Sequence, residues 1–149
     1  MSLEQKVMEE MKGAMRAKDE AALRTLRAIK AAILLEKTSG SGVEITEADE
    51  TKMLQKMAKQ RRDSLEIFVQ QNREDLAQKE REELAIIDRF LPQQMTAEEL
   101  QAAVKDIIAQ VGASSPADMG KVMGVASKQL AGKADGRAIS ETVKQLLAQ

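Results

Sequence analysis

The chain has 149 residues, 43% hydrophobic and 32% charged, and its 23 basic and 24 acidic residues give a net charge of -1, so bulk charge favours no class of partner. It contains no cysteine and no histidine, which excludes a thiol nucleophile, an imidazole base and a zinc site built from these ligands. The polar start of the chain and the lack of an apolar run of about 20 residues predict a cytoplasmic protein without a signal peptide or membrane segment.

Apolar residues recur at a spacing near 3.6 and do not alternate with period two, so we predict helices and no strands. A first helix covers residues 3–14, and a second begins at Asp19, a fair N-cap, and reaches residue 34. Their expected buried residues are Leu3, Val7, Met11, Ala14, Leu23, Leu26, Ile33 and Leu34. The segment TSGSGV, residues 38–43, then breaks the helical pattern.

A third helix opens at Thr46, which forms a capping box with Asp49, and Asn72 ends it in a left-handed turn. A fourth helix follows and stops before Pro92, because proline disfavours helix at the residue that precedes it. The expected buried residues of the two are Leu54, Met57, Leu65, Phe68, Leu76, Leu84, Ile87 and Leu91. The four helices should form one N-terminal bundle, residues 1–92.

The segment LPQQMT marks the expected boundary to a second domain, residues 96–149, which opens with a capping box from Thr96 to Glu99. Its first helix ends at Gly112 and carries the clearest apolar stripe of the chain: Leu100, Val104, Ile107, Ile108 and Val111.

The next helix should be capped by Ser115, with Pro116 in its first turn and Asp118 completing a capping box, and should close at Gly132. The last helix follows Asp135 and Gly136 and buries Ile139, Val143, Leu146 and Leu147. We therefore predict an all-α protein: an N-terminal bundle of about four helices followed by a small C-terminal three-helix domain.

The stretch DMGKVMGVASKQLAGKADGR, residues 118–137, places lysines beside glycines. It is not a P-loop, because Lys121 precedes Val122 instead of Ser or Thr and no strand comes before it. At helical spacing the residues with little or no side chain form one ridge: Gly120, Gly124, Ser127 and Ala131. Either a neighbouring helix packs closely against this ridge or an external partner docks there, and the two readings are about equally favoured.

Charge favours docking slightly, because residues 119–133 contain three lysines and no acid. Ammonium groups beside a ridge without side chains suit contact with the sugar-phosphate backbone of folded RNA. The alternative is that the lysines only form a solvated face of the helix. The candidate RNA-binding residues are Lys133, Lys121, Lys128, Arg137, Gly120, Gly124 and Gly132.

A secondary candidate is the stretch KMLQKMAKQRR, residues 52–62, which contains five basic residues and no acid: Lys52, Lys56, Lys59, Arg61 and Arg62. Ion pairing with the acidic fourth helix is the favoured alternative for this stretch. Only Phe68 and Phe90 are aromatic, so reading of unpaired bases is not expected, nor is DNA sequence readout. No nucleophile–base pair or metal-ligand pattern is recognisable, and we expect no cofactor or metal.

Five segments together resemble the GatB/YqeY family over nearly the whole chain: LRTLRAIKAAILLE, KQRRDSLEIF, REDLAQKEREELAIIDRFLPQQMTAEEL, DMGKVMG and GKADGRAISETVKQLL. The resemblance implies a helical bundle followed by a three-helix domain similar to the tail of GatB, the tRNA-dependent amidotransferase subunit, in which the tail binds tRNA. Similar tails occur on some glutaminyl-tRNA synthetases. The Gly-x-x-Met and Gly-Lys-Ala elements of the tail match Gly120, Met123, Gly132, Lys133 and Ala134, and Lys133 is the leading single candidate.

The resemblance also associates the family with carbon–nitrogen ligase activity that uses glutamine as amido-N donor. Because the residues themselves offer no active site, we expect a non-catalytic module that binds tRNA, alone or beside an amidotransferase or an aminoacyl-tRNA synthetase. Two alternatives stay open: a protein-interaction adaptor, and a subunit that contributes to ligase activity only within a complex.

Overall fold

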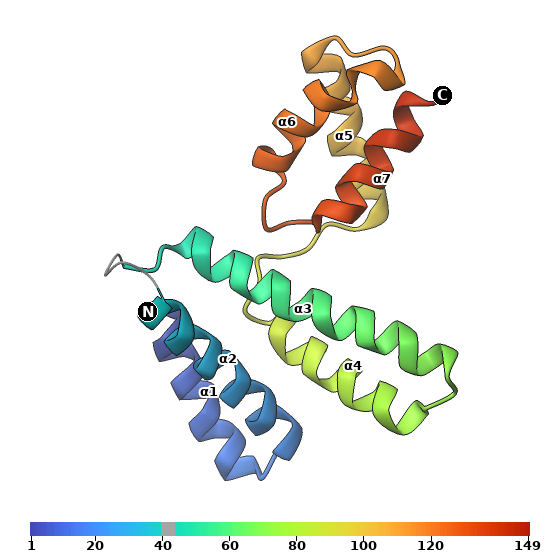
Figure 1. Ribbon diagram of the computed structural model, residues 1–149. Helices are drawn as coiled ribbons and strands as arrows, with labels where there is room; N and C mark the ends of the chain where they lie inside the picture. The colour runs from blue at the N-terminus through green and yellow to red at the C-terminus, as the bar shows by residue number, and fades with distance from the viewer. Residues whose placement is uncertain (40–43) are drawn as a thin grey trace. The chain divides into compact units, whose positions relative to one another are not determined.

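The computed structural model describes residues 1–39 and 44–149, and within them the protein forms seven α-helices and one 3-10 turn, with no strand (Figure 1). The predicted all-α fold class is confirmed. The elements are α1 (Leu3–Ala17), α2 (Glu20–Ser39), α3 (Glu47–Gln70), α4 (Glu74–Asp88), α5 (Ala97–Val111), η1 (Pro116–Asp118), α6 (Met119–Gln129) and α7 (Gly136–Leu147). Of the predicted break at residues 38–43, Thr38 and Ser39 belong to α2, and the remainder lies outside the described residues.

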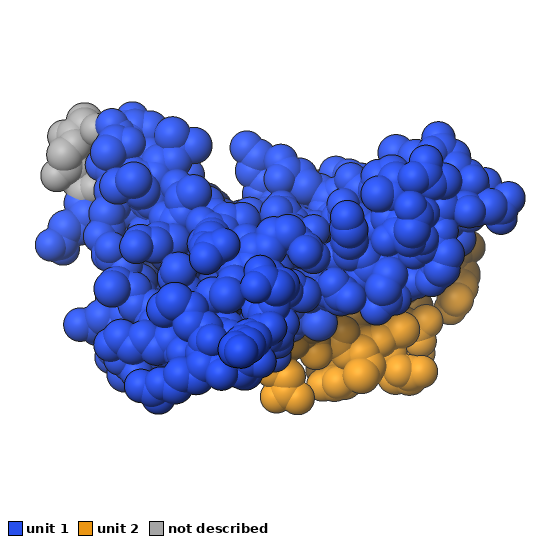
Figure 2. Space-filling model, turned by 90° about the horizontal axis from the view of Figure 1, so that it is seen from below, with its two compact units in different colours: residues 1–92 blue, residues 93–149 orange. Residues whose placement is uncertain are grey.

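The described chain divides into two compact units, residues 1–92 and residues 93–149, which Figure 2 colours blue and orange. Helices α1–α4 belong to the first unit and α5–α7 to the second. Each unit has a hydrophobic core made only of its own residues. A substitution in one core can therefore be assigned to one unit.

Two helix pairs build the first unit, α1 with α2 and α3 with α4 (Figure 1). Asp19 caps α2, because its carboxylate accepts a hydrogen bond from the Ala22 N–H at 3.0 Å. Asn72 joins α3 to α4 with a left-handed φ of 57°. The Asp19 cap and the left-handed turn at Asn72 both lie where the sequence predicts them. Packing of α2 against α4 joins the two pairs.

The core of the first unit follows most of the predicted apolar positions. Its largest fully buried side chains include Val7, Leu26, Ile29, Leu54 and Ile87. The expectation for Leu34 is wrong: it is 62% exposed, because it lies one helical step, about 100°, from the buried Ile33. Leu65 and Phe68 are only half-buried, because all buried residues of α3 lie between residues 53 and 58.

Three helices enclose the core of the second unit, formed by Leu100, Val104, Ile107, Val122, Ala126, Leu130, Ile139, Val143 and Leu147. The predicted capping box opens α5: the Thr96 hydroxyl accepts from the Glu99 N–H at 3.1 Å, and the Glu99 carboxylate accepts from the Thr96 N–H at 3.2 Å. Gly112 ends the helix with a φ of 68°, as predicted. These two signals fix the length of α5.

The start of α6 differs from the prediction. Pro116–Asp118 form a 3-10 turn, and the α-helix begins only at Met119. The side chain of Ser115 makes no capping hydrogen bond; instead, the Asp118 carboxylate accepts a hydrogen bond from the Ser114 N–H at 3.0 Å. The predicted capping box is therefore wrong, because Asp118 is engaged by a backbone group one residue before the expected cap.

Candidate nucleic-acid interface

One face of α6 and the turn that follows it carries almost no side chains, and we call it the α6 ridge: Gly120, Gly124, Ser127 and Ala131, all exposed. The opposite face buries Val122 and Ala126 in the core of the second unit. Helix α6 packs there with α5 and α7 (Figure 1). A methyl group placed on Gly120 or Gly124 would meet none of the surrounding described residues within 4 Å. A neighbouring helix therefore does not explain these glycines within the described part of the protein, and both face open space.

Two lysines border the α6 ridge. Lys121 and Lys128 are exposed and seven residues apart, which separates them by about 10 Å along the helix axis. Neither forms an ion pair with a carboxylate of the described residues. The pKa of Asp118 is lowered, first by the N–H that Ser114 donates to it and, to a smaller extent, by the positive charge of Lys121. The border of the ridge is therefore positively charged, with one acidic group close to its first lysine.

Gly132 belongs to the loop between α6 and α7 and not to the α6 ridge. It is buried, and its φ of 80° is left-handed. Its carbonyl accepts a hydrogen bond from Gln94 Nε2 at 2.7 Å, and the Lys133 carbonyl accepts one from the Met95 N–H at 2.9 Å. Gly132 thus shapes a loop that is bonded to residues 94 and 95, while the Lys133 side chain is exposed. The sequence predicted that Gly132 closes the helix, and its left-handed backbone just after α6 agrees with that role, whereas its grouping with Gly120 and Gly124 as an RNA-binding residue did not anticipate its burial.

The two kinds of glycine should respond to alanine with opposite signs. Gly124→Ala should raise the free energy of unfolding of the second unit by about 1 kcal/mol, because alanine is the better helix former and open space surrounds the new methyl group. Gly132→Ala should lower it by roughly 1–2 kcal/mol, because a side chain disfavours left-handed backbone. Urea denaturation followed by the amide signals of α5–α7 measures both, and loss of stability in Gly124→Ala would show that something does pack on the ridge.

Arg137 lies at the start of α7, where its guanidinium pairs with Glu141 at 3.3 Å. The side chains of Arg137 and Glu141 are 75% and 62% exposed. A pair so open to water contributes little to stability. Arg137 can therefore exchange this carboxylate for another anion at small cost.

The secondary basic cluster, residues 52–62, is divided by the structure. Lys52 and Lys56 are exposed on α3, and Lys59 pairs with Asp63 of the same helix at 3.1 Å. Arg61 is only 18% exposed and lies 3.7 Å from Glu83 of α4. The ion pairing with the fourth helix that the sequence favoured is thus present for Arg61.

Arg62 of the same cluster also acts on α4. Burial raises the pKa of Asp88, and the positive charge of Arg62 opposes that shift. Burial likewise raises the pKa of Glu80, with Glu83 adding to the shift and Arg61 opposing it. These carboxyl groups belong to the first unit, whereas the α6 ridge lysines belong to the second.

No helix within residues 1–39 and 44–149 is long and apolar enough to cross a membrane. The same described residues contain no group of three or more acidic side chains that could hold a metal ion.

Comparison with known proteins matches residues 4–147 to the family described as Yqey-like protein. Similar relatives carry the name "Altered inheritance of mitochondria protein 41, mitochondrial". The relative from Lachancea thermotolerans is 31% identical over 109 residues, 72% of this chain and 58% of the relative. The relative from Candida glabrata is 32% identical over 91 residues, 60% and 46% of the two chains. The relative from Kluyveromyces lactis is 28% identical over 138 residues, 91% and 71%.

The chain spans about half the length of the first two relatives, 58% and 46%. Their printed name refers to mitochondria and mentions no ligand or reaction. The family match covers more of this chain than the matches to the relatives from Lachancea thermotolerans and Candida glabrata do, because it reaches from residue 4 to residue 147 of the 149. The chain therefore belongs to the family of Yqey-like proteins.

Proposed function

We propose that this protein binds tRNA through the sugar-phosphate backbone, as a non-catalytic accessory module that works alone or beside an amidotransferase or an aminoacyl-tRNA synthetase. The supporting observation is the exposed α6 ridge with its lysine border. A glycine inside a helix costs about 1 kcal/mol relative to alanine, and nothing in the described residues packs on Gly120 or Gly124. A partner that approaches the helix backbone closely supplies a reason for both glycines.

The chemistry of the second unit suits a backbone contact better than contact with bases. Phe68 and Phe90, the two aromatic residues of the chain, both lie in the first unit, so residues 93–149 have no ring on which a base could stack. Exposed lysines bind phosphates as point charges and release counterions from the nucleic acid. Lys133 and Arg137, which follow α6 in the chain, extend the set of cations to four with Lys121 and Lys128. The resemblance to the GatB tail supports tRNA as the nucleic acid.

Binding of tRNA should weaken steeply with salt. With three or four phosphate contacts, the association constant should fall roughly 20- to 150-fold between about 50 mM and about 200 mM salt. Filter binding with purified tRNA at the two salt concentrations gives this ratio directly. Absence of salt-sensitive binding would count against the proposal.

The same ridge also fits a helix of a partner protein, since small residues let two helix backbones approach closely, and this is the second candidate function. A pull-down with and without nuclease separates the two. Loss of captured material after nuclease treatment agrees with an RNA-binding module. Capture of a protein that survives the nuclease and is blocked by Gly124→Leu would instead assign the ridge to an adaptor.

A further inference from the structure

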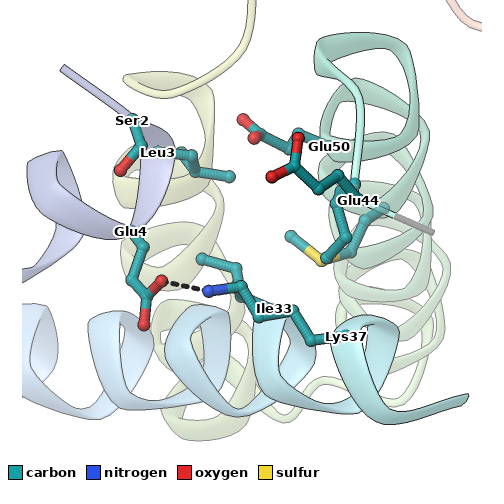
Figure 3. A pocket seen from close by; sticks show the side chains of 9 residues that line it. Ser2, Leu3, Glu4, Ile33, Lys37, Glu44 and Glu50 are labelled. Carbon is teal, nitrogen blue, oxygen red and sulfur yellow. Dashed lines mark hydrogen bonds and ion pairs between the residues drawn. The ribbon is translucent and has the colours of Figure 1, made fainter. Parts of the chain in front are cut away.

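A cavity of about 430 Å³ lies in the first unit, where the start of α1, the end of α2 and the start of α3 meet (Figure 3). It is lined by Ser2, Leu3, Glu4, Ile33, Lys37, Glu44, Ile45, Glu50 and Met53. No local sequence pattern predicts this cavity, because its walls come from three helix ends that are far apart in the chain. A volume of this size is in the range of sites that bind small organic molecules.

The floor of the cavity is apolar and is part of the hydrophobic core of the first unit. Leu3, Ile33 and Met53 are 7%, 5% and 8% exposed and belong to the core of the first unit. Two of the three helix ends that form the walls are fixed by capping boxes, the α1 box at Ser2 and the α3 box at Thr46. The cavity therefore offers a preformed apolar surface that an alkyl chain can cover.

Some of the charged side chains around this floor form an ion pair, and others have no direct partner among the described residues. Glu4 and Lys37 form an ion pair on one side of the cavity (Figure 3). Glu44 and Glu50 point toward the cavity from the other side, and neither forms an ion pair or a side-chain hydrogen bond with the described residues. The wall near α3 thus carries two carboxylates without a direct counter-charge.

The pKa of Glu50 reflects the burial of this carboxylate without a direct counter-charge. Burial raises its pKa, the neighbouring Glu47 adds to the shift, and the positive charges of Lys6 and Lys37 oppose it only in part. A cation placed beside Glu50 would therefore be stabilised by the carboxylate, and would in turn stabilise the ionised carboxylate. A hard metal ion fits less well, because it needs several oxygen ligands and the side chains of Leu3, Ile33 and Met53 on the floor supply no oxygen.

We propose that this cavity binds a primary ammonium group carried on an unbranched alkyl stem, with the ammonium beside Glu44 and Glu50 and the stem on Leu3, Ile33 and Met53. The ligand chemistry is that of a small aliphatic amine or of a lysine side chain. The site lies entirely within residues 2–53 and does not depend on the α6 ridge or on RNA.

Titration of the full chain with 1,5-diaminopentane, followed by amide NMR signals, tests the proposal. Saturable shifts are expected at Leu3, Ile33 and Met53, and 1-pentanol, which has the same stem without the charges, should bind at least about tenfold more weakly. A parallel titration with Nα-acetyl-lysine N-methylamide compares the two sources of the amine. Tighter binding of the diamine assigns a free amine as the ligand, and tighter binding of the lysine amide assigns a lysine side chain.

The matched variants are Glu44→Gln/Glu50→Gln and, as control, Glu36→Gln/Glu66→Gln, which makes the same change in charge at exposed positions. Affinity for the diamine should fall at least about tenfold in the first pair and less than about twofold in the second. The glutamines keep the size of the side chains, so the spectrum away from the cavity should not change. Equal binding of 1-pentanol, or unchanged affinity in Glu44→Gln/Glu50→Gln, would overturn the proposal.

Discussion

Replacing Lys121, Lys128 and Lys133 together by glutamate is expected to lower the affinity for tRNA at least about a hundredfold. The change removes two cations beside the α6 ridge and one in the loop that follows α6, and it puts three anions in their place, which repel the phosphates. All three side chains are exposed, and none is paired with a carboxylate of the described residues. The triple variant should therefore stay folded, which circular dichroism checks, while filter binding measures the affinity.

The matched control replaces Lys79, Lys105 and Lys144 by glutamate. These lysines are also exposed but lie on α4, α5 and α7, away from the ridge in sequence, and the net charge changes by the same amount. Their replacement should weaken binding only through the general field, by about tenfold or less. An equal loss in both triple variants would mean that the protein binds tRNA by net charge without a defined site.

A second large effect is expected from truncating one core at a time. Leu26 and Ile107 are 1% and 2% exposed, in the cores of the first and second units. Leu26→Ala and Ile107→Ala should each lower the stability of their own unit by about 2–5 kcal/mol. Because the α6 ridge lies in the second unit, Ile107→Ala should reduce tRNA binding when it unfolds that unit, whereas Leu26→Ala should leave binding intact.

Urea denaturation followed by amide signals from each unit, together with filter binding, measures both parts of this expectation. The conservative changes Leu26→Met and Ile107→Val serve as controls and should cost less than about 1.5 kcal/mol each. Loss of tRNA binding in Leu26→Ala alone would move the interface to the first unit, where the cluster at residues 52–62 is the alternative.

Local signals predicted the helices well because they act within a few residues. The capping boxes at Thr46 and Thr96 both form, and Asn72 and Gly112 are left-handed where helices end. The error at the start of α6 is equally local, because Asp118 lies only four residues from the backbone group that it bonds. At the start of α6, Asp118 bonds to the Ser114 N–H and displaces the expected Ser115 cap.

At the candidate site, too, local sequence predicted some features and could not predict others. Helical spacing was enough to place Gly120 and Gly124 on one face of α6, but not to show whether that face is covered, since this depends on where α5 and α7 pack. Local sequence placed Gly132 at the close of the helix, but not its hydrogen bond with Gln94, which is 38 residues away in the chain. The cavity beside Glu50 could not be predicted, because it exists only where three separate helix ends meet.

On the proposed function, the phosphate backbone of tRNA lies directly against the exposed glycines of α6. The most direct measurement compares tRNA affinity of the unaltered chain with that of Gly120→Leu/Gly124→Leu at one low salt concentration. The leucines keep every charge and enter open space, so the fold should persist while affinity falls at least about tenfold, because the backbone can no longer approach the helix. Equal tRNA affinity in the two proteins, or no binding by either, would contradict the account.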